Sequence, residues 1–143
     1  MNKYSISTCH FQAEWGGTRI GFSEISGLSI EHDVIEYRDG SSSEYTRIKM
    51  PGLSKSSNIV LKRGIIKGDN EFYQWINTIN LNQVERRDLT ISLLNEEHIP
   101  VMVWKVKNAW PVKLEGPVLR SGVSEVAMET LELAHEGITI VAN

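Results

Sequence analysis

The sequence lacks several features that would mark a secreted, membrane or metal-binding protein. Its 143 residues include one cysteine, Cys9, so an intramolecular disulfide and a thiolate metal cluster are excluded. No apolar run reaches the roughly 18 residues that a membrane span needs. Only five residues precede Ile6, too few for the apolar region of roughly 7–15 residues that a cleaved signal peptide requires. We therefore expect neither a membrane anchor nor a signal peptide.

An excess of basic charge is also missing. The formal net charge is −3, and the two basic pairs, Lys62-Arg63 and Arg86-Arg87, have no interleaved aromatic residues. A nucleic-acid binder needs a strong, clustered basic surface, so this class is disfavoured. The segment from Lys113 to Asn143 carries two basic and five acidic side chains. Its charge indicates either a solvated face or a surface that repels an anionic passenger.

Recognisable catalytic and cofactor-binding motifs are absent as well. There is no Gly-x-Ser-x-Gly elbow, no phosphate-binding loop and no Gly-x-Gly-x-x-Gly sequence. The histidines show neither i,i+4 pairing nor metal-ligand spacing with the cysteine. An enzyme with a dispersed site would need a deep pocket with convergent polar groups, which no motif predicts. We expect no catalytic residue, no cofactor and no metal. The four histidines of the chain are His10, His32, His98 and His135.

The strongest pattern in the sequence is a β-hairpin. The dipeptide Asp39-Gly40 lies between two alternating segments, 34–38 and 44–50, which is a strong short-range hairpin signal. We predict an extended hairpin over about residues 34–50, with one packed face and one solvated face. Pro51-Gly52-Leu53 is expected to turn the chain, so residues 51–55 are predicted to form a loop.

Other short strands and breaks surround this hairpin. We expect a first strand over 6–14 and a kink at Ser26-Gly27. A strand that opens at Arg86 alternates cleanly, with Leu89 and Ile91 on one face. Apolar residues occupy both faces of the segment 99–107, which predicts a strand covered on two sides by the fold or by another chain. Further strands and breaks are expected at 58–62, 108–111, 115–117 and 121–122.

One helix is predicted, over about residues 70–81. Asp69 can accept hydrogen bonds from the first-turn amides, and Phe72, Trp75, Ile76 and Ile79 recur at helical spacing. Several weak helix formers follow, so the helix is expected to be short and to depend on tertiary packing. The fold class is therefore mainly β, an antiparallel sandwich or barrel with one short helix, in a single domain over 1–143.

The sequence of residues 124–136 fits either a helix or a strand. Val123, Val126, Leu131 and Ala134 recur at helical spacing, and Gly137 fits the position after a helix end. Read as a strand, the segment changes its apolar face midway. Such a change requires a bulge or a strand that passes between two layers.

Six short words in order along the chain resemble one family, the tail-tube proteins of contractile phages and of phage-tail-like extracellular contractile injection systems. One of them is a C-terminal signature in two parts, Glu125 to Glu129 and Leu131 to Gly137, and the resemblance implies a strand there. The others are Phe22 to Leu28, Leu61 to Gly64, Phe72 to Ile76, Arg86 to Leu89, and Pro100 to Trp104 with Asn108 to Pro111.

The resemblance also implies a function. Such subunits form hexameric rings that stack into a rigid hollow tube inside a contractile sheath and do no bond chemistry. The implied partners are further copies, the sheath protein, baseplate and tube-terminating proteins, and a lumen cargo: an effector protein, or DNA and a tape measure in a phage. The implied location is the bacterial cytoplasm during assembly and then a phage tail or a released injection particle, with a slight preference for the particle.

On this interpretation the hairpin supplies contacts between subunits. A second hypothesis is that strand pairing between subunits carries one sheet around the bore, with Arg47 and Lys49 facing the lumen. The competing hypothesis is a monomeric β-sandwich that binds a ligand through Trp15, Trp104 or Trp110. The predicted inter-subunit residues are Asp39, Gly40, Ser41, Ser42, Tyr45, Arg47, Lys49, Pro51, Gly52 and Leu53.

Overall fold

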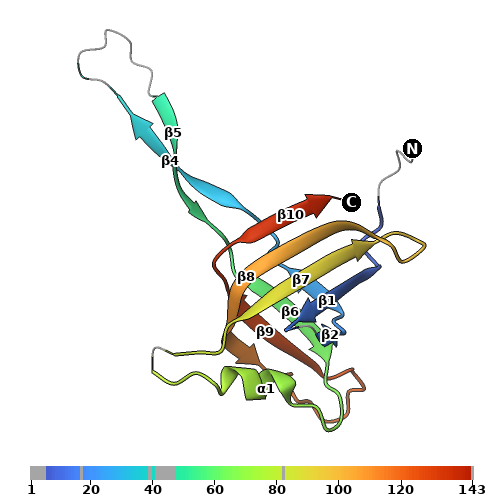
Figure 1. The fold of residues 1–143 in the computed structure, drawn as a ribbon. Coiled ribbons are helices and arrows are strands. Elements are labelled where there is room, and N and C mark those ends of the chain that lie inside the picture. The colour runs from blue at the N-terminus through green and yellow to red at the C-terminus, as the bar shows by residue number, and fades with distance from the viewer. Residues whose placement is uncertain (1–5, 17, 39, 41–47, 82, 143) are drawn as a thin grey trace.

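The computed structural model describes residues 6–16, 18–38, 40, 48–81 and 83–142, and these are mainly β-strand. The fold class is therefore as predicted: antiparallel sheets and one short helix (Figure 1). The elements are β1 (Phe11–Trp15), β2 (Thr18–Ile20), β3 (Glu24–Ser26), β4 (Glu31–Tyr37), β5 (Ile48–Lys55), β6 (Ile59–Gly64), α1 (Glu71–Ile76), β7 (Arg87–Leu94), β8 (Pro100–Glu115), β9 (Met128–Ala134) and β10 (Ile138–Ala142).

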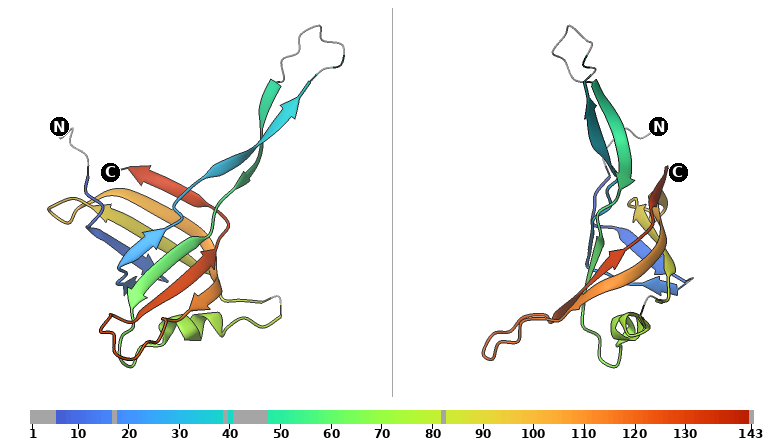
Figure 2. Two further views of the ribbon diagram at one scale, coloured as in Figure 1. Left: turned by 180° about the vertical axis from the view of Figure 1, so that it is seen from behind. Right: turned by 90° about the vertical axis from the view of Figure 1, so that its left-hand side faces the viewer.

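Strand β8 connects the two layers of the main sheet. The order is β2-β1-β7-β8-β9-β6-β3, and β10 also pairs with β8. The first half of this 16-residue strand pairs with β7 and β10, and its second half pairs with β9. Register shifts interrupt both ladders, and Asn108 between them has φ 51°. These irregularities bend the strand, so that one sheet folds back over itself (Figure 2).

The bend in β8 corrects one prediction. Residues 108–111 were expected to break the chain, yet the strand continues through them to Glu115. Asn108 tolerates a positive φ, and Pro111 lies where the register with β9 shifts, so neither residue ends the strand. The feature that looked like a turn in sequence is instead a bulge within a long strand.

The core fills the space between the two layers. Alternate residues of β6, β7 and β9 point inward, and Ile59, Leu61, Leu131 and Leu133 are each 0% exposed. Leu89 and Ile91 of β7 are buried, as the alternation predicts. An aromatic cluster closes the end of the core beneath α1, with ring centroids 4.9–5.9 Å apart; its members are Trp15, Phe22, Phe72 and Trp75.

Helix α1 is shorter than predicted, because it ends at Ile76 and not near residue 81. The Thr78 hydroxyl donates to the Trp75 carbonyl oxygen over 2.7 Å, a local bond that competes with helix continuation. At the other end the cap residue is Asn70, but the predicted bond exists: the Glu71 amide donates to Asp69 Oδ1 over 3.0 Å. The described part of the chain contains no helix long and apolar enough to cross a membrane.

The ambiguous segment 124–136 contains strand β9, so the helical interpretation is wrong. Leu131 and Leu133 are buried because β9 pairs with β6 on one side and β8 on the other. Val126 is 77% exposed and lies before the strand, which begins only at Met128. The apolar face therefore never has to change within the strand.

Two further boundaries differ from their predictions, and one predicted kink is confirmed. The first strand begins at Phe11 and not at residue 6. The kink at Gly27 is present, with φ +90°, and an added Cβ would lie 2.2 Å from the Asn58 carbonyl oxygen. Residues 51–55 form part of β5 and are not a loop, because Pro51 pairs with Val34. Proline is tolerated there because both strands of a two-stranded ribbon are edges.

Strands β4 and β5 form a separate two-stranded sheet that projects from the sandwich (Figures 1 and 2). The predicted hairpin is thus confirmed, with longer arms than expected. The prediction that one of its faces packs is wrong for this chain by itself, since every residue of β4 is exposed. The hairpin packs against nothing in the described part of its own chain along most of its length.

Candidate assembly surfaces

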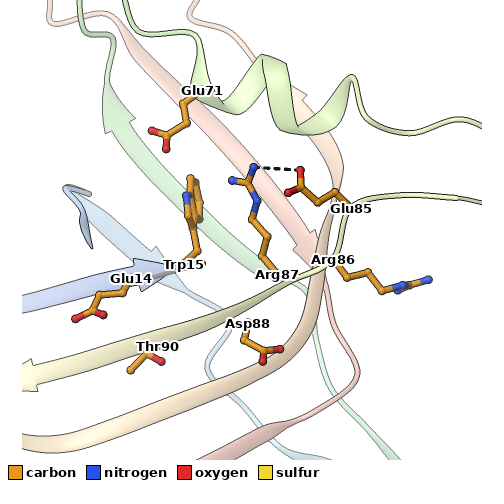
Figure 3. A pocket seen from close by; sticks show the side chains of 9 residues that line it. Glu14, Trp15, Glu71, Glu85, Arg86, Arg87, Asp88 and Thr90 are labelled. Carbon is orange, nitrogen blue, oxygen red and sulfur yellow. Dashed lines mark hydrogen bonds and ion pairs between the residues drawn. The ribbon is translucent and has the colours of Figure 1, made fainter. Parts of the chain in front are cut away.

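A hollow of about 670 Å³ lies beside the start of β7 (Figure 3). Several of its charged groups have structural partners: Arg87 Nη2 lies 3.2 Å from Glu85 Oε2, and the Arg87 guanidinium covers the Trp75 ring at 4.6 Å. Asp88 Oδ1 accepts a hydrogen bond from the Asn108 amide over 3.1 Å. The described lining contains neither histidine nor cysteine, and these contacts hold the aromatic cluster in place.

A second charged cluster surrounds Arg63, whose side chain is 4% exposed. Its Nε donates to Glu129 Oε1 over 2.7 Å, and its Nη2 lies 3.3 Å from Asp69 Oδ1. Glu71 Oε2 is 3.7 Å from Nη1, and the guanidinium lies 3.9 Å from the centre of the Phe72 ring. This buried cation connects β6, β9 and the start of α1, so its role is structural.

The sequence reasoning missed this role because it treated Lys62-Arg63 as an isolated basic pair. A signal was available, since Ile59, Leu61 and Arg63 share one face of β6, and the first two of these residues are core aliphatics. Arginine at the third position of such a face predicts a buried cation that requires carboxylate partners.

The histidines do not gather into a ligand set. Among the described residues, no group of three or more histidine, cysteine, aspartate or glutamate side chains is placed to hold a metal ion. The His10 and His98 rings lie 5.1 Å apart, and His135 Nε2 is 3.0 Å from the Ser57 carbonyl oxygen. His32 is exposed on β4. These contacts fix turns and strand ends.

The tryptophans do not form a ligand-binding platform. Trp15 is 2% exposed and Trp75 is 0% exposed, so both belong to the core. Trp104 and Trp110 are half-buried on β8. The monomeric binding module that uses surface tryptophans is therefore not favoured.

One face of the hairpin exposes several large apolar side chains. Strand register pairs Ile35 with Met50 and Tyr37 with Ile48, so these four side chains share a face. They are between 45% and 59% exposed. The opposite face carries the cross-strand pair Glu36 and Lys49. We call the four residues Ile35, Tyr37, Ile48 and Met50 the apolar hairpin face.

The structure places half of the predicted inter-subunit residues. Gly40, Lys49, Pro51 and Leu53 are exposed, and Gly52 is half-buried against β4. Asp39, Ser41, Ser42, Tyr45 and Arg47 lie outside the described residues. The predicted set contains none of the four residues of the apolar hairpin face, although the alternation along both arms signals this face.

Comparison with known proteins shows the family of the chain. The model of the T4-like virus tail tube protein gp19 family matches residues 7–139. The chain belongs to this family. No curated protein matches at the sequence level. Tail tube proteins are structural components of particles, so the functional sites of this chain are the surfaces through which it assembles.

Solved structures agree with this assignment. A chain of the PVC sheath-tube complex, an extracellular contractile injection system in its extended state, is 39% identical with a TM-score of 0.91, over 99% of this chain and 94% of that one. A chain of the anti-feeding prophage tube-terminating cap is 38% identical, with a TM-score of 0.92 over 100% and 95%. Hcp1 from Flavobacterium johnsoniae shares the fold, at 16% identity and a TM-score of 0.56 over 93% and 95%.

Proposed function

We infer that the chain is the subunit of the rigid inner tube of a contractile injection particle. Six copies close into a ring, and rings stack into a hollow tube that a contracting sheath drives into a target envelope. The observation that carries this function is the 39% identity, over 99% of the chain, to a component of an extended sheath-tube complex. The whole chain, residues 1–143, acts as one tube domain.

The partners follow from the same relatives, whose structures include a sheath-tube complex, a tube-terminating cap and a baseplate. This chain contacts further copies of itself, a sheath protein, a baseplate and a terminating protein. The lumen carries an effector protein, or DNA and a tape measure if the particle is a phage tail. Assembly takes place in the bacterial cytoplasm before the particle is released, and the chain catalyses no reaction.

The hairpin supports a role in assembly. An isolated two-stranded hairpin is marginally stable in water, and it becomes stable when another element covers its apolar face. All of β4 and nearly all of β5 are exposed in the single chain. In a tube, a neighbouring subunit covers the apolar hairpin face. The predicted inter-subunit residues of the hairpin other than Arg47 and Lys49, together with its apolar face, form this contact, whereas the role proposed for Arg47 and Lys49 is to face the lumen.

Electron microscopy of the purified full-length chain tests the function. We expect rings about one subunit thick and stacked tubes of the same diameter. Light scattering provides the control, since the apparent mass rises with concentration as rings stack. A chain that stays monomeric and monodisperse at high concentration contradicts the proposed function.

A further inference from the structure

His135 lies in the turn between β9 and β10, and both nitrogens of its ring have a backbone partner. The Gly137 amide donates to His135 Nδ1 over 3.1 Å, and His135 Nε2 lies 3.0 Å from the Ser57 carbonyl oxygen. A backbone amide only donates and a carbonyl oxygen only accepts. The two contacts together therefore require one tautomer, in which Nδ1 carries no proton and Nε2 donates. This is the neutral form of the ring.

The two bonds of His135 join parts of the fold that are distant in sequence. Gly137 directly precedes β10 and has φ +145°, a conformation that residues with side chains rarely adopt. Ser57 lies between β5 and β6, at the base of the hairpin, and its hydroxyl oxygen is 2.6 Å from Ser29 Oγ, just before β4. His135 thus ties the start of β10 to the base of the hairpin (Figure 1).

A second proton on the ring is incompatible with this arrangement. The imidazolium ion carries a hydrogen on both nitrogens, so Nδ1–H would face the N–H of Gly137 and the bond between them would be lost. The ring then has to turn away or the β9–β10 turn has to move. Histidine is the side chain whose charge ordinarily changes between about pH 5 and 8. The arrangement therefore suits neutral pH and is disrupted by acid.

The surrounding charges do not compensate for the lost bond. The segments brought together by these bonds are 27–31, 55–59, 106–109 and 132–137. Their charged residues are Glu31, Lys55, Lys107, Glu132 and Glu136. Glu132 accepts a hydrogen bond from Asn58 and Glu136 accepts one from Asn108, and no carboxylate in the described part of the chain lies within 4 Å of a His135 ring nitrogen. A protonated ring therefore has no ion pair to hold it in place.

We propose that His135 is a pH-sensitive switch within the subunit. The neutral ring fastens the β9–β10 turn to the base of the hairpin, and the protonated ring releases both. Protonation is not opposed by the local charge, because the segment from Lys113 to Asn143 is acidic as a whole. The switch goes beyond the proposed function, since it belongs to the single chain and requires no assembly.

Nuclear magnetic resonance of the dispersed full-length chain tests the switch between about pH 7.5 and 5. At the higher pH the nitrogen resonances of the His135 ring should show a proton on Nε2 alone. On acidification, the Gly137 amide resonance should shift with the same midpoint as this ring. Its protection against hydrogen exchange should fall by about two- to tenfold, the factor that corresponds to one hydrogen bond of ordinary net strength.

Three single variants separate the switch from a merely structural role. The side-chain oxygen of His135→Asn can accept from the amide two residues later and does not titrate, so the Gly137 amide should stay protected at both pH values. His135→Ala should leave this amide unprotected at both. His32→Asn, which removes an exposed histidine of β4, is the matched control and should keep the full pH response of the unmodified chain.

Several results would overturn the proposal. A Gly137 amide that does not respond while the His135 ring gains its proton would show that the two are not coupled. An unchanged pH response in His135→Asn would assign the response to another group. If His135→Ala does not fold, the titrations of the unmodified chain and of His135→Asn still decide the matter. Failure of the proposed function is distinguishable, because a chain that forms no rings can be titrated in the same way.

Discussion

Strand β7 and strand β4 have similar alternating sequences and opposite environments. In β7 the apolar face is closed by the chain itself, and Leu89 and Ile91 are 1% and 2% exposed. In β4 the corresponding residues, Ile35 and Tyr37, are 49% and 53% exposed. Alternation therefore predicts which face of a strand requires a cover, but not whether the cover comes from the same chain. In this protein the body covers its own apolar faces, whereas the described part of the chain leaves the hairpin face exposed.

The largest expected effect lies in the body. Trp75 is fully buried and contacts Trp15 and Arg87. Because the site cannot collapse around so large a loss, Trp75→Ala should lower the free energy of unfolding by about 3–5 kcal/mol. Urea unfolding of dispersed subunits measures the change. The control is Tyr73→Ala on the exposed face of the same helix, expected within about 0.5 kcal/mol of the unmodified protein. Equal effects at the two sites would contradict the assignment of Trp75 to the core.

A smaller loss is expected from the buried charge cluster. Glu129→Ala removes the 2.7 Å partner of the Arg63 guanidinium, while Asp69 and Glu71 remain within 4 Å. We expect the free energy of unfolding to fall by about 1.5–3 kcal/mol, the range for a buried hydrogen bond to a charged group. Glu115→Ala removes an exposed ion pair with Lys113 and serves as the control. If both variants unfold at the same urea concentration, the cluster does not stabilise the fold as its burial indicates.

Substitutions in the hairpin should have little effect on subunit stability and a large effect on assembly. The double change Ile35→Asp and Tyr37→Asp removes two cross-strand pairs from an exposed ribbon. Each pair contributes roughly 0.2–1 kcal/mol, so the unfolding of dispersed subunits should change little. Tube formation should nevertheless be lost, because the buried face of the contact now carries charge. A variant that assembles normally would show that the hairpin is not an assembly surface.

The smallest effect is expected at the base of the hairpin. Lys55 Nζ lies 2.9 Å from Asp33 Oδ1, and the hydrogen bond and charge of Asp33, with a further contribution from Glu31, raise the pKa of Lys55 above its ordinary value. Because the pKa of Lys55 is raised in the folded state, the contribution of this ion pair to stability is complete below the unfolded pKa of about 10.4. It is lost as the pH rises through the pKa of the folded state. Lys55→Gln should therefore lower the melting temperature slightly at neutral pH and not at strongly alkaline pH. Added salt should reduce the difference, since the pair is exposed. An effect that grows with pH would contradict this sign.

Much of the fold could be predicted because local signals determine it. The Asp39-Gly40 dipeptide between alternating arms predicted the hairpin, and the spacing of Phe72 and Trp75 predicted the helix. The features that failed depend on distant residues. Whether Leu131 and Leu133 lie in a helix or a strand is decided by β6 and β8, which no local window contains. Residues 108–111 looked like a break, because nothing in the sequence shows that β9 pairs beyond it.

The assembly surfaces were predictable to a lesser degree. The predicted set was centred on the polar hairpin tip and on residues 51–53, and it omitted the apolar hairpin face. The exposed residues Val118 and Leu119 were not predicted as a surface, since they lie between turn signals and resemble an ordinary connection. Exposure, which only the structure gives, is what shows that these aliphatic residues lack a cover.

Hydrogen–deuterium exchange on the same preparation before and after assembly tests the central claim most directly. If neighbours complete the hairpin, the amides of β4 and β5 should exchange rapidly in dispersed subunits and become strongly protected in tubes. The amides of β7, already paired on both sides, should be protected equally in both states. Tubes in which β4 and β5 still exchange as fast as in the dispersed chain would contradict the account.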